Sequence, residues 1–251
     1  MARRGQKKHL KRLPAPKHWP IKRKHGKFTT RPIPGPHAKE ECLTLAILLR
    51  EVLGRAENMR EVKAIVSSGD VFVDGRPKRN PRYPVGIMDV VEIKSSGDKY
   101  RLLPKIRGGL RLVEIDDAET QFKLSRIEKK MMVPGGKVQL SLHDGRNILL
   151  PDGAKASDYS TLDTLVISVP EQKLMETIPL DKGAYAIVTQ GRNVGMEGKI
   201  VESEKRIGTH ASTVTVEDPN GNRFQTALEY VFVIGKNKPK VKIGEAGGAA
   251  E

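Results

Sequence analysis

The chain has 251 residues, of which 37% are hydrophobic and 30% charged, so it allows one large domain or two to three small ones. No apolar run in the chain approaches the roughly 18 residues that a membrane span needs, so we expect no membrane span. A short apolar segment near the start is also missing, so we expect no secretory leader. Its single cysteine, Cys42, excludes an internal disulfide and a cysteine-based metal cage, and we expect it to be buried in a protein of a reducing compartment.

The formal net charge is +15, and nearly all of the excess lies at one end of the chain. Residues 1–39 contain 13 Lys or Arg and no Asp or Glu, whereas the other 212 residues contain 32 basic and 30 acidic residues. This distribution describes a cationic arm on a nearly neutral body. Nucleic acid is the usual partner of such an arm, because released counterions drive the binding. An anionic membrane surface is the second option, which the lack of an amphipathic helical period disfavours.

The arm, residues 1–41, has too few large apolar residues to fold by itself, and its prolines block helix and sheet pairing. We therefore expect it to be extended and mobile until it threads an RNA crevice, where Lys and Arg meet phosphates. A targeting segment and a solvated tail are the alternatives, although the arm lacks the pattern of a transit peptide. The side chains that can stack on unpaired bases are His18, Trp19, His25 and Phe28. The predicted RNA contacts of the arm are Arg3, Arg4, Lys7, Lys8, Lys11, Arg12, Lys17, Trp19, Lys22, Arg23, Lys24 and Arg31.

Two helices are predicted after the arm. The first spans Cys42–Leu53 and ends at Gly54; its apolar residues recur at helical spacing, as Leu45, Leu48, Leu49 and Val52. The second begins at Asn58, because Glu61 three residues later completes a capping box, and it ends at Gly69. Its buried stripe is formed by Met59, Val62 and Val66.

Short strands follow the helices. Strands are predicted at Val71–Val73 and Val90–Lys94, with a tight turn at Asp74-Gly75 after the first. The basic loop, residues 76–83, has four positive charges in eight residues and no acidic side chain. Each cation alone would be read as a solvated charge, but together they predict one basic surface. Its predicted RNA contacts are Arg50, Arg55, Arg60, Lys63, Arg76, Lys78, Arg79 and Arg82.

This order of elements resembles a known family. The segments Ser68–Gly75 and Val85–Val91 look like the S-four-type RNA-binding domain, which grips structured RNA with two helices and the loop after them. In the arm, His9–Leu13, Ala15–Trp19 and Arg31–His37 resemble the S-four-e family of archaeal and eukaryotic small-subunit ribosomal proteins. We place the RNA-binding domain at residues 42–105.

Residues 106–178 predict a compact, β-rich central domain, because short β-like runs alternate with turn signals such as Pro134-Gly135-Gly136 and Pro151-Asp152-Gly153. The runs are Leu110–Ile115, Phe122–Ile127, Lys137–Leu142, Ile148–Leu150 and Leu162–Val169. Between two of them, His143-Asp144-Gly145-Arg146 favours a hairpin turn over an acid–base site. An RNA-modifying enzyme is the catalytic alternative, but the segment is too short and too subdivided for its catalytic domain.

Residues 179–243 predict a small SH3-like barrel, with strands at Gly183–Thr189, Thr213–Glu217, Phe224–Ala227 and Tyr230–Ile234 and a turn at Pro219–Asn222. The glycine-rich stretch Gly191–Val201 is neither a P-loop nor a dinucleotide loop. Asn193 and Glu197 occupy positions where those patterns require Gly, and Ile200 stands where a P-loop needs Ser or Thr.

The same stretch resembles the KOW motif, which implies RNA contacts at Arg192, Asn193 and Lys199. The alternative is a loop whose glycines serve folding alone. Val231–Gly235 also looks like the C-terminal signature of the S-four-e family, although Glu229-Tyr230 departs from the more polar lead-in expected there. Residues 244–251 form a short acidic tail, which we expect to be flexible.

The resemblance covers residues 7–243 in collinear order and implies an α+β multidomain protein, built from arm, RNA-binding domain, central domain and KOW barrel. It further implies a cytoplasmic, archaeal-type structural constituent of the small ribosomal subunit that binds ribosomal RNA and neighbouring ribosomal proteins. We expect no enzymatic activity, cofactor, metal, membrane or small-molecule substrate. A KOW-containing transcription or RNA-processing factor is the remaining alternative.

Overall fold

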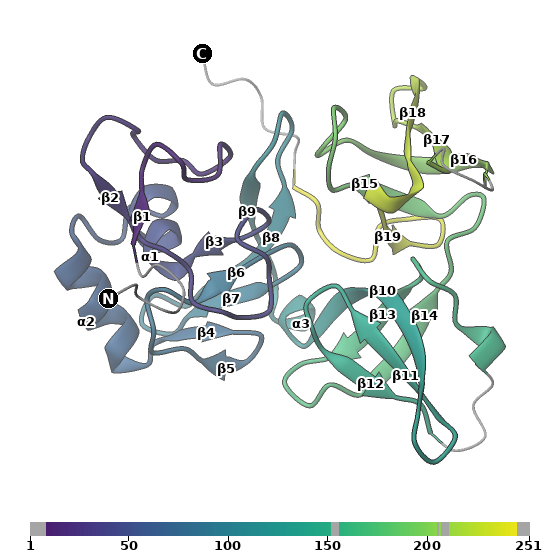
Figure 1. Ribbon diagram of the computed structural model, residues 1–251, viewed down its shortest axis with the longest axis horizontal. Coiled ribbons are helices and arrows are strands. Elements are labelled where there is room, and N and C mark those ends of the chain that lie inside the picture. Colours follow the sequence, from purple (N-terminus) through teal and green to yellow (C-terminus); the bar gives the residue numbers. More distant parts are fainter. Residues whose placement is uncertain (1–8, 152–155, 205, 207–210, 245–251) are drawn as a thin grey trace, which may run out of the picture.

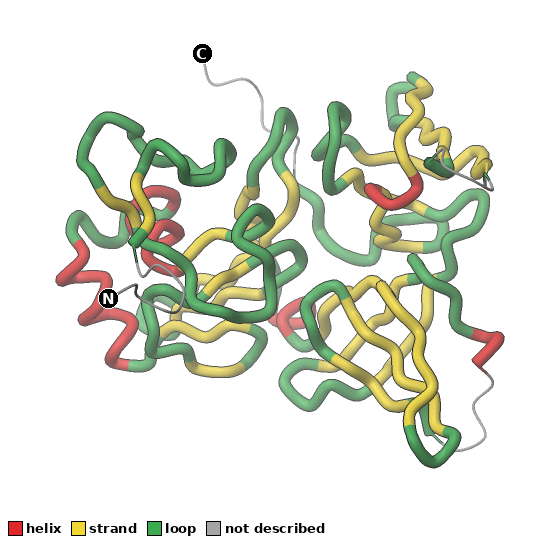
Figure 2. The backbone as a smooth tube through the Cα atoms, in the orientation of Figure 1, coloured by secondary structure: helices red, strands yellow, loops and turns green. Residues whose placement is uncertain are grey.

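The computed structural model describes residues 9–151, 156–204, 206 and 211–244, and this part of the chain is mostly β with few helices (Figure 2). Its strands form three five-stranded sheets and two short two-stranded ladders, all with antiparallel pairing (Figure 1). The β-rich character expected from the sequence is confirmed, while the first predicted helix is shorter than expected.

The first sheet follows the predicted helices. Its strands are β4 (Val71–Val73), β5 (Arg76–Pro77), β7 (Val90–Ile93), β8 (Asp98–Pro104) and β9 (Leu110–Glu114). They lie in the order β5-β4-β7-β8-β9, so the sheet extends past residue 105. The tight turn forms as predicted, with φ of 49° at Asp74 and 67° at Gly75.

The first predicted helix begins later than expected. The elements are β3 (Leu43–Thr44), β6 (Pro84–Val85), α1 (Leu45–Ile47) and a π-helix, η1 (Leu48–Val52). Cys42–Thr44 is extended rather than helical because β3 pairs with β6, a partner that local spacing cannot reveal. The Thr44 hydroxyl accepts a hydrogen bond from the Ile47 N–H and caps α1. Val52 is 38% exposed, so its assignment to the buried face was wrong.

The second predicted helix is confirmed as α2 (Met59–Ser68). The Asn58 side chain accepts hydrogen bonds from the N–H groups of Arg60 and Glu61, at 2.9 and 3.1 Å. The Glu61 carboxylate accepts from the N–H of Glu57 at 2.8 Å, one residue before the N-cap, so the predicted capping box forms with its return hydrogen bond shifted by one residue. Gly69 ends the helix with φ of 88°, a conformation that favours glycine. Val62 and Val66 of α2 are fully buried.

The second sheet contains four of the five strands predicted for the central domain and one that was missed; the fifth predicted strand, Leu110–Ile115, is instead β9 of the first sheet. The second sheet has the order β12-β11-β10-β13-β14, and β14 had no sequence signal. The turns at Pro134-Gly135-Gly136 and His143–Arg146 form hairpins as predicted, whereas the turn at Pro151-Asp152-Gly153 lies largely outside the described residues. The elements are α3 (Asp117–Thr120), β10 (Phe122–Val133), β11 (Lys137–Leu142), β12 (Asn147–Leu149), the 3-10 turn η2 (Ala156–Asp158), β13 (Thr164–Ser168) and β14 (Leu174–Ile178).

The third sheet has the strand order β18-β17-β16-β15-β19, with β18 and β19 as its edge strands. The turn at Pro219–Asn222 forms as predicted, and the Asp218 N–H donates to the Asn222 carbonyl at 2.9 Å. Closure of this sheet into an SH3-like barrel stays a prediction. The elements are β15 (Tyr185–Val188), β16 (Glu197–Glu204), β17 (Thr213–Glu217), β18 (Arg223–Ala227), the 3-10 turn η3 (Leu228–Tyr230) and β19 (Val231–Gly235).

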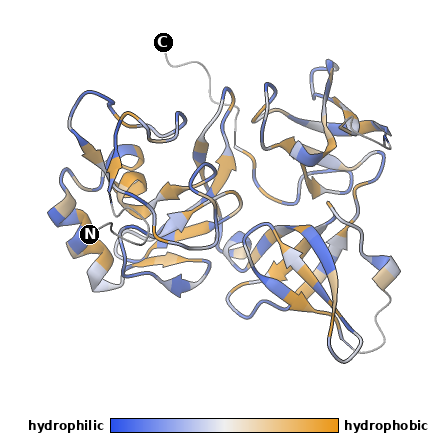
Figure 3. Ribbon diagram, in the orientation of Figure 1, coloured by the Kyte–Doolittle hydropathy of each residue, from blue (hydrophilic) through white to orange (hydrophobic). Residues whose placement is uncertain are grey.

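One apolar core joins the three sheets. It contains Leu103 from the first sheet, Leu124 and Val166 from the second, and Ile187 and Val231 from the third. Apolar residues gather along the strands, whereas the loops of the arm are largely hydrophilic (Figure 3). Because the core is shared, the sheets hold one another in place.

Candidate nucleic-acid interface

The arm packs on the body, contrary to the expectation that it is extended and mobile. Trp19 is 3% exposed and shares a core cluster with the first sheet and α1. Its indole N–H donates to the Cys42 carbonyl at 2.7 Å, so both the ring and its polar atom are satisfied. Trp19 is therefore not presented to RNA for base stacking, which corrects the role predicted for it. Cys42 is buried, as predicted, and burial raises the pKa of its thiol to about 12.

Two arginines of the arm stabilise its turns. The Arg23 guanidinium donates to the carbonyls of Arg12 and Ala15 at 2.9 and 2.7 Å, and to that of Pro16 at 2.7 Å. Arg12 donates to the carbonyl of Phe28 at 3.1 Å, beside the short ladder of β1 (Leu10–Lys11) and β2 (Phe28–Thr29). Since carbonyls are neutral, both guanidiniums keep their full positive charge while fixing the backbone.

The arm lysines project outward. Lys11, Lys17, Lys22 and Lys24 are exposed, and in the part of the arm that the structure describes they form no ion pair with a carboxylate. An exposed ammonium without a carboxylate is available to a phosphate. The predicted contacts Arg3, Arg4, Lys7 and Lys8 lie outside the described residues.

The basic loop lies against both the arm and α2. Arg82 donates to the Arg31 carbonyl at 2.8 Å, and the Ile33 N–H donates back to the Arg82 carbonyl at 3.0 Å. The Arg79 side chain lies beside Gly69, the C-cap of α2, since a Cβ added at Gly69 would lie 3.6 Å from Arg79 Nε. The structure thus brings the loop close to the end of α2 and also to the arm, which the predicted basic surface did not include. We call the exposed cations of these three segments the cationic surface: Lys11, Lys17, Lys22, Lys24, Lys27, Arg60, Lys63, Arg76 and Arg79.

Other predicted contacts are engaged internally. Arg50 pairs with Glu51 at 2.8 Å, and Arg55 pairs with Asp98. The Lys78 ammonium lies 4.5 Å from the centre of the Tyr83 ring, and burial together with Arg76 lowers the pKa of Lys78. These side chains therefore contribute less free charge than their sequence cluster indicated.

The glycine-rich stretch is part of the third sheet. A Cβ at Gly195 would lie 2.4 Å from the Ile106 backbone nitrogen, and one at Gly198 would lie 2.1 Å from the Glu217 carbonyl oxygen. Both glycines are therefore required by internal packing, which supports the folding alternative for them. Arg192 and Lys199 are nevertheless exposed, while the Asn193 amide donates to the Gln225 carbonyl at 3.2 Å.

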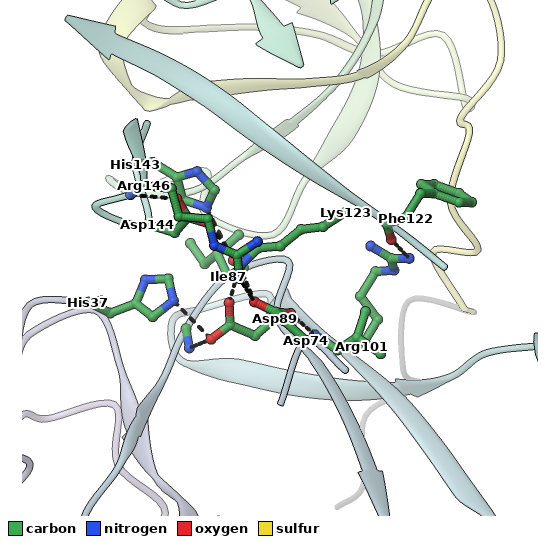
Figure 4. Close-up of polar contacts among 12 residues, drawn as sticks. His37, Asp74, Ile87, Asp89, Arg101, Phe122, Lys123, His143, Asp144 and Arg146 are labelled. Carbon is green, nitrogen blue, oxygen red and sulfur yellow. Dashed lines mark hydrogen bonds and ion pairs between the residues drawn. The ribbon is translucent and has the colours of Figure 1, made fainter. Parts of the chain in front are cut away.

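A buried charge junction joins the first two sheets. Lys123, on β10, lies within 2.9 Å of Asp74 and 3.1 Å of Asp144, and it also contacts Asp89 (Figure 4). Arg146 contacts Asp74 and lies 3.3 Å from Asp144. We call these five side chains the charge junction. The side chains of Lys123, Asp89 and Asp144 are each 1% exposed.

Two histidines flank the charge junction. His37 of the arm lies 2.9 Å from an Asp89 carboxylate oxygen. His143 receives a hydrogen bond from the Arg126 N–H at 3.2 Å, and its ring packs edge-on against Phe232 of β19. The junction with its histidines therefore connects the arm and all three sheets.

The ionisation of the junction follows from its pairing. Burial opposes the charge on Lys123, but Asp74, Asp89 and Asp144 outweigh it and raise the Lys123 pKa. Burial likewise opposes the ionisation of Asp89, yet its interactions with His37 and Lys123 hold the pKa of Asp89 well below its usual range. Burial and the Lys123 ammonium lower the pKa of His143 to about 3.

The charge junction is a structural feature and not an acid–base site. Lys123, Asp89 and Asp144 are buried away from any substrate, and the lowered pKa of His143 makes its imidazole a weak base. Among the described residues there is no group of three or more His, Cys, Asp or Glu arranged to hold a metal. The charge junction has only a weak signal in the sequence: Lys123 interrupts an apolar run, but the three carboxylates come from distant turns.

Comparison with known proteins places these features in a class. The model of the ribosomal family S4e matches residues 96–174, and that of the RS4NT (NUC023) domain matches residues 4–40. Small ribosomal subunit protein eS4 of Staphylothermus marinus is 51% identical over 249 residues, covering 98% of this chain and 99% of the relative. The protein of the same name from Methanocaldococcus jannaschii is 43% identical, covering 97% of this chain and 100% of the relative.

A solved structure of an S4e protein is also similar to this chain. The crystal structure of the 30S ribosomal protein S4e from Thermoplasma acidophilum has a TM-score of 0.64 and 32% identity, covering 78% of this chain and 96% of that chain. These likenesses define a ribosomal protein, which is a structural class and not an enzyme class. The chain belongs to the ribosomal family S4e. Within the described residues, no helix is both long and apolar enough to cross a membrane.

Proposed function

We propose that this chain is a structural constituent of the small ribosomal subunit, where it binds and stabilises folded ribosomal RNA. The observation that carries the proposal is the cationic surface: hydrogen bonds of Arg82 with Arg31 and Ile33 hold the arm against the basic loop, and the Arg79 side chain of that loop lies beside Gly69 at the end of α2. The curated relatives are named small ribosomal subunit proteins.

Phosphate recognition accounts for this arrangement. A folded RNA presents phosphates at fixed spacings, so cations on a rigid support lose less conformational entropy on binding than cations on a mobile tail. The charge junction supplies such support, because it links the first sheet, which carries the basic loop, to the second sheet. Binding then consists of phosphate and sugar contacts on folded RNA, with neighbouring ribosomal proteins as further partners and the cytoplasmic ribosome as its location.

The third sheet is the second proposed contact region. Arg192, Asn193 and Lys199 carry it, within a KOW-type barrel spanning residues 179–243. Arg192 and Lys199 are exposed, which supports this assignment. The remaining division assigns residues 1–41 to the arm, 42–105 to the RNA-binding domain, 106–178 to the central domain and 244–251 to the tail.

The test uses the full chain with a small-subunit ribosomal RNA transcript at moderate salt. The variant Arg60→Glu with Arg79→Glu reverses two charges of the cationic surface, and Lys129→Glu with Lys173→Glu makes the same change in net charge on exposed residues of the central domain. We expect the first variant to lose most of its affinity in a filter-binding assay and the second to keep most of it. Equal loss in both would show only unspecific attraction and contradict the proposal, as would failure of the chain to co-sediment with small subunits.

A further inference from the structure

Phe28 is the aromatic side chain that the fold leaves open. It is 50% exposed, and no other Phe, Tyr or Trp of the described residues is classed as exposed. All of the chain's aromatic residues lie within that part. The fold therefore buries the one tryptophan and leaves Phe28 of the same arm at the surface. The sequence named both as candidates for base stacking, and the structure distinguishes between them.

The backbone beneath Phe28 is fixed before any partner arrives. Phe28 pairs with Lys11 in the ladder of β1 and β2, and the Arg12 N–H donates to the Lys27 carbonyl at 3.1 Å. The Arg12 guanidinium donates to the Phe28 carbonyl itself at 3.1 Å. The ring thus stands on a closed turn of the arm, and little conformational entropy is lost when it is covered.

The neighbours of the ring are cationic or imidazole groups. The Lys27 ammonium lies 5.6 Å from the ring centre, and the His9 ring lies 5.5 Å away at an angle of 45°. Lys11 projects from the paired position, and residues 1–39 contain no Asp or Glu. An apolar protein surface does not need such a setting, whereas a nucleotide does, because its base offers a flat face and its phosphate a negative charge.

We propose that Phe28 is a stacking platform for an unpaired RNA base, with Lys11 and Lys27 beside it to meet the phosphates of that strand. This inference rests on the proposed function and adds the kind of RNA element that the arm contacts: a single-stranded loop or bulge rather than a duplex, whose bases are stacked and out of reach. The exposed methionines at the β10–β11 hairpin, Met131 and Met132, have no aromatic face and are not equivalent.

The test compares Phe28→Leu, Phe28→Trp and Leu13→Ala in the full chain. Leu13 is the matched control, because it is an exposed apolar side chain of the same arm, 76% exposed. The probes are the small-subunit ribosomal RNA transcript and a single-stranded oligoribonucleotide that carries the fluorescent base 2-aminopurine. Trp19 is the only tryptophan in Phe28→Leu and Leu13→Ala, so its fluorescence emission reports whether the arm remains docked in these two variants.

We expect Phe28→Leu to bind both probes about tenfold more weakly and to quench 2-aminopurine less, while Phe28→Trp and Leu13→Ala bind as the natural chain does. The salt dependence of binding should stay unchanged in Phe28→Leu, because no phosphate contact is lost. Natural affinity in Phe28→Leu would overturn the inference and leave the proposed function standing. A reduced salt slope with Trp19 emission unchanged would also overturn it, since Phe28 would then act by placing lysines. If the natural chain binds neither probe, the proposed function itself fails.

Discussion

The ammonium of Lys123 and those of the arm lysines carry the same charge in opposite surroundings. Lys123 is 1% exposed and surrounded by Asp74, Asp89 and Asp144, whereas Lys11, Lys17, Lys22 and Lys24 are exposed without a carboxylate partner among the described residues. The buried charge is neutralised within the protein and holds the sheets together. The exposed charge is left for a partner. A net charge of +15 therefore says little about RNA binding until each cation is identified as paired within the protein or exposed to a partner.

The largest effect is expected from Lys123→Met. Removing the ammonium leaves buried carboxylates without their shared partner, which costs about 3–5 kcal/mol in the free energy of unfolding. Urea unfolding of the purified chain measures this cost. The matched control is Lys173→Met, which removes an exposed ion pair with Glu171 and should leave the unfolding midpoint unchanged. Equal midpoints in the two variants would show that the charge junction does not stabilise the fold.

Trp19→Ala should affect the arm more than the body. The indole fills the contact between arm and body, and its loss should weaken docking of the arm by about 3 kcal/mol. Amide hydrogen exchange of residues 10–29 then becomes faster, while that of the sheets stays slow. Leu13→Ala, at an exposed position of the same arm, should leave these rates unchanged. Rapid exchange of the arm in the natural chain would show that it is not docked.

Acid should destabilise the fold in two stages. His143 has its pKa lowered from 6.5 to about 3, so between these values the unfolded chain binds a proton that the folded chain does not. Stability therefore falls as pH drops below 6.5, by about 1.4 kcal/mol per unit for this one group. Asp89 and Asp144 have lowered pKa values as well, so their contribution is present above the ordinary aspartate pKa and is lost as pH falls through and below it.

His143→Gln separates the two stages. The variant keeps a polar side chain of similar length but cannot titrate. Urea midpoints measured from pH 7 to pH 2 should fall less steeply in His143→Gln than in the natural chain down to about pH 3, and the two should run parallel below it. Identical profiles over the whole range would show that His143 does not titrate as its surroundings require.

Local signals in the sequence predicted local structure well. Asn58, Glu61 and Gly69 fixed both ends of α2, and the Asp-Gly turns at residues 74–75 and 144–145 both formed hairpins. Each of these features depends on residues within a few positions of one another, so spacing is sufficient to find them.

Contacts between distant residues explain what the sequence missed. The start of α1 was misplaced because β3 pairs with β6, and the arm appeared unable to fold because the pocket for Trp19 is built by the body. The hairpin turn at Asp144 was predicted, but not that its carboxylate would meet Lys123 of a neighbouring strand. For the same reason the cationic surface was predicted in outline, while the internal roles of Arg12, Arg23 and Arg50 were not.

The smallest effect on stability, and the largest on salt dependence, is expected when Lys11, Lys17, Lys22 and Lys24 are all changed to Ala. The most direct measurement of the difference between buried and exposed charge is the affinity of this variant for small-subunit ribosomal RNA over a range of salt concentrations. If the four ammonium groups meet phosphates, the log–log slope should fall by about 3, while the urea midpoint and Trp19 emission stay unchanged. An unchanged slope would contradict the proposed role of the exposed charge, because it would show that the arm lysines do not contact RNA phosphates.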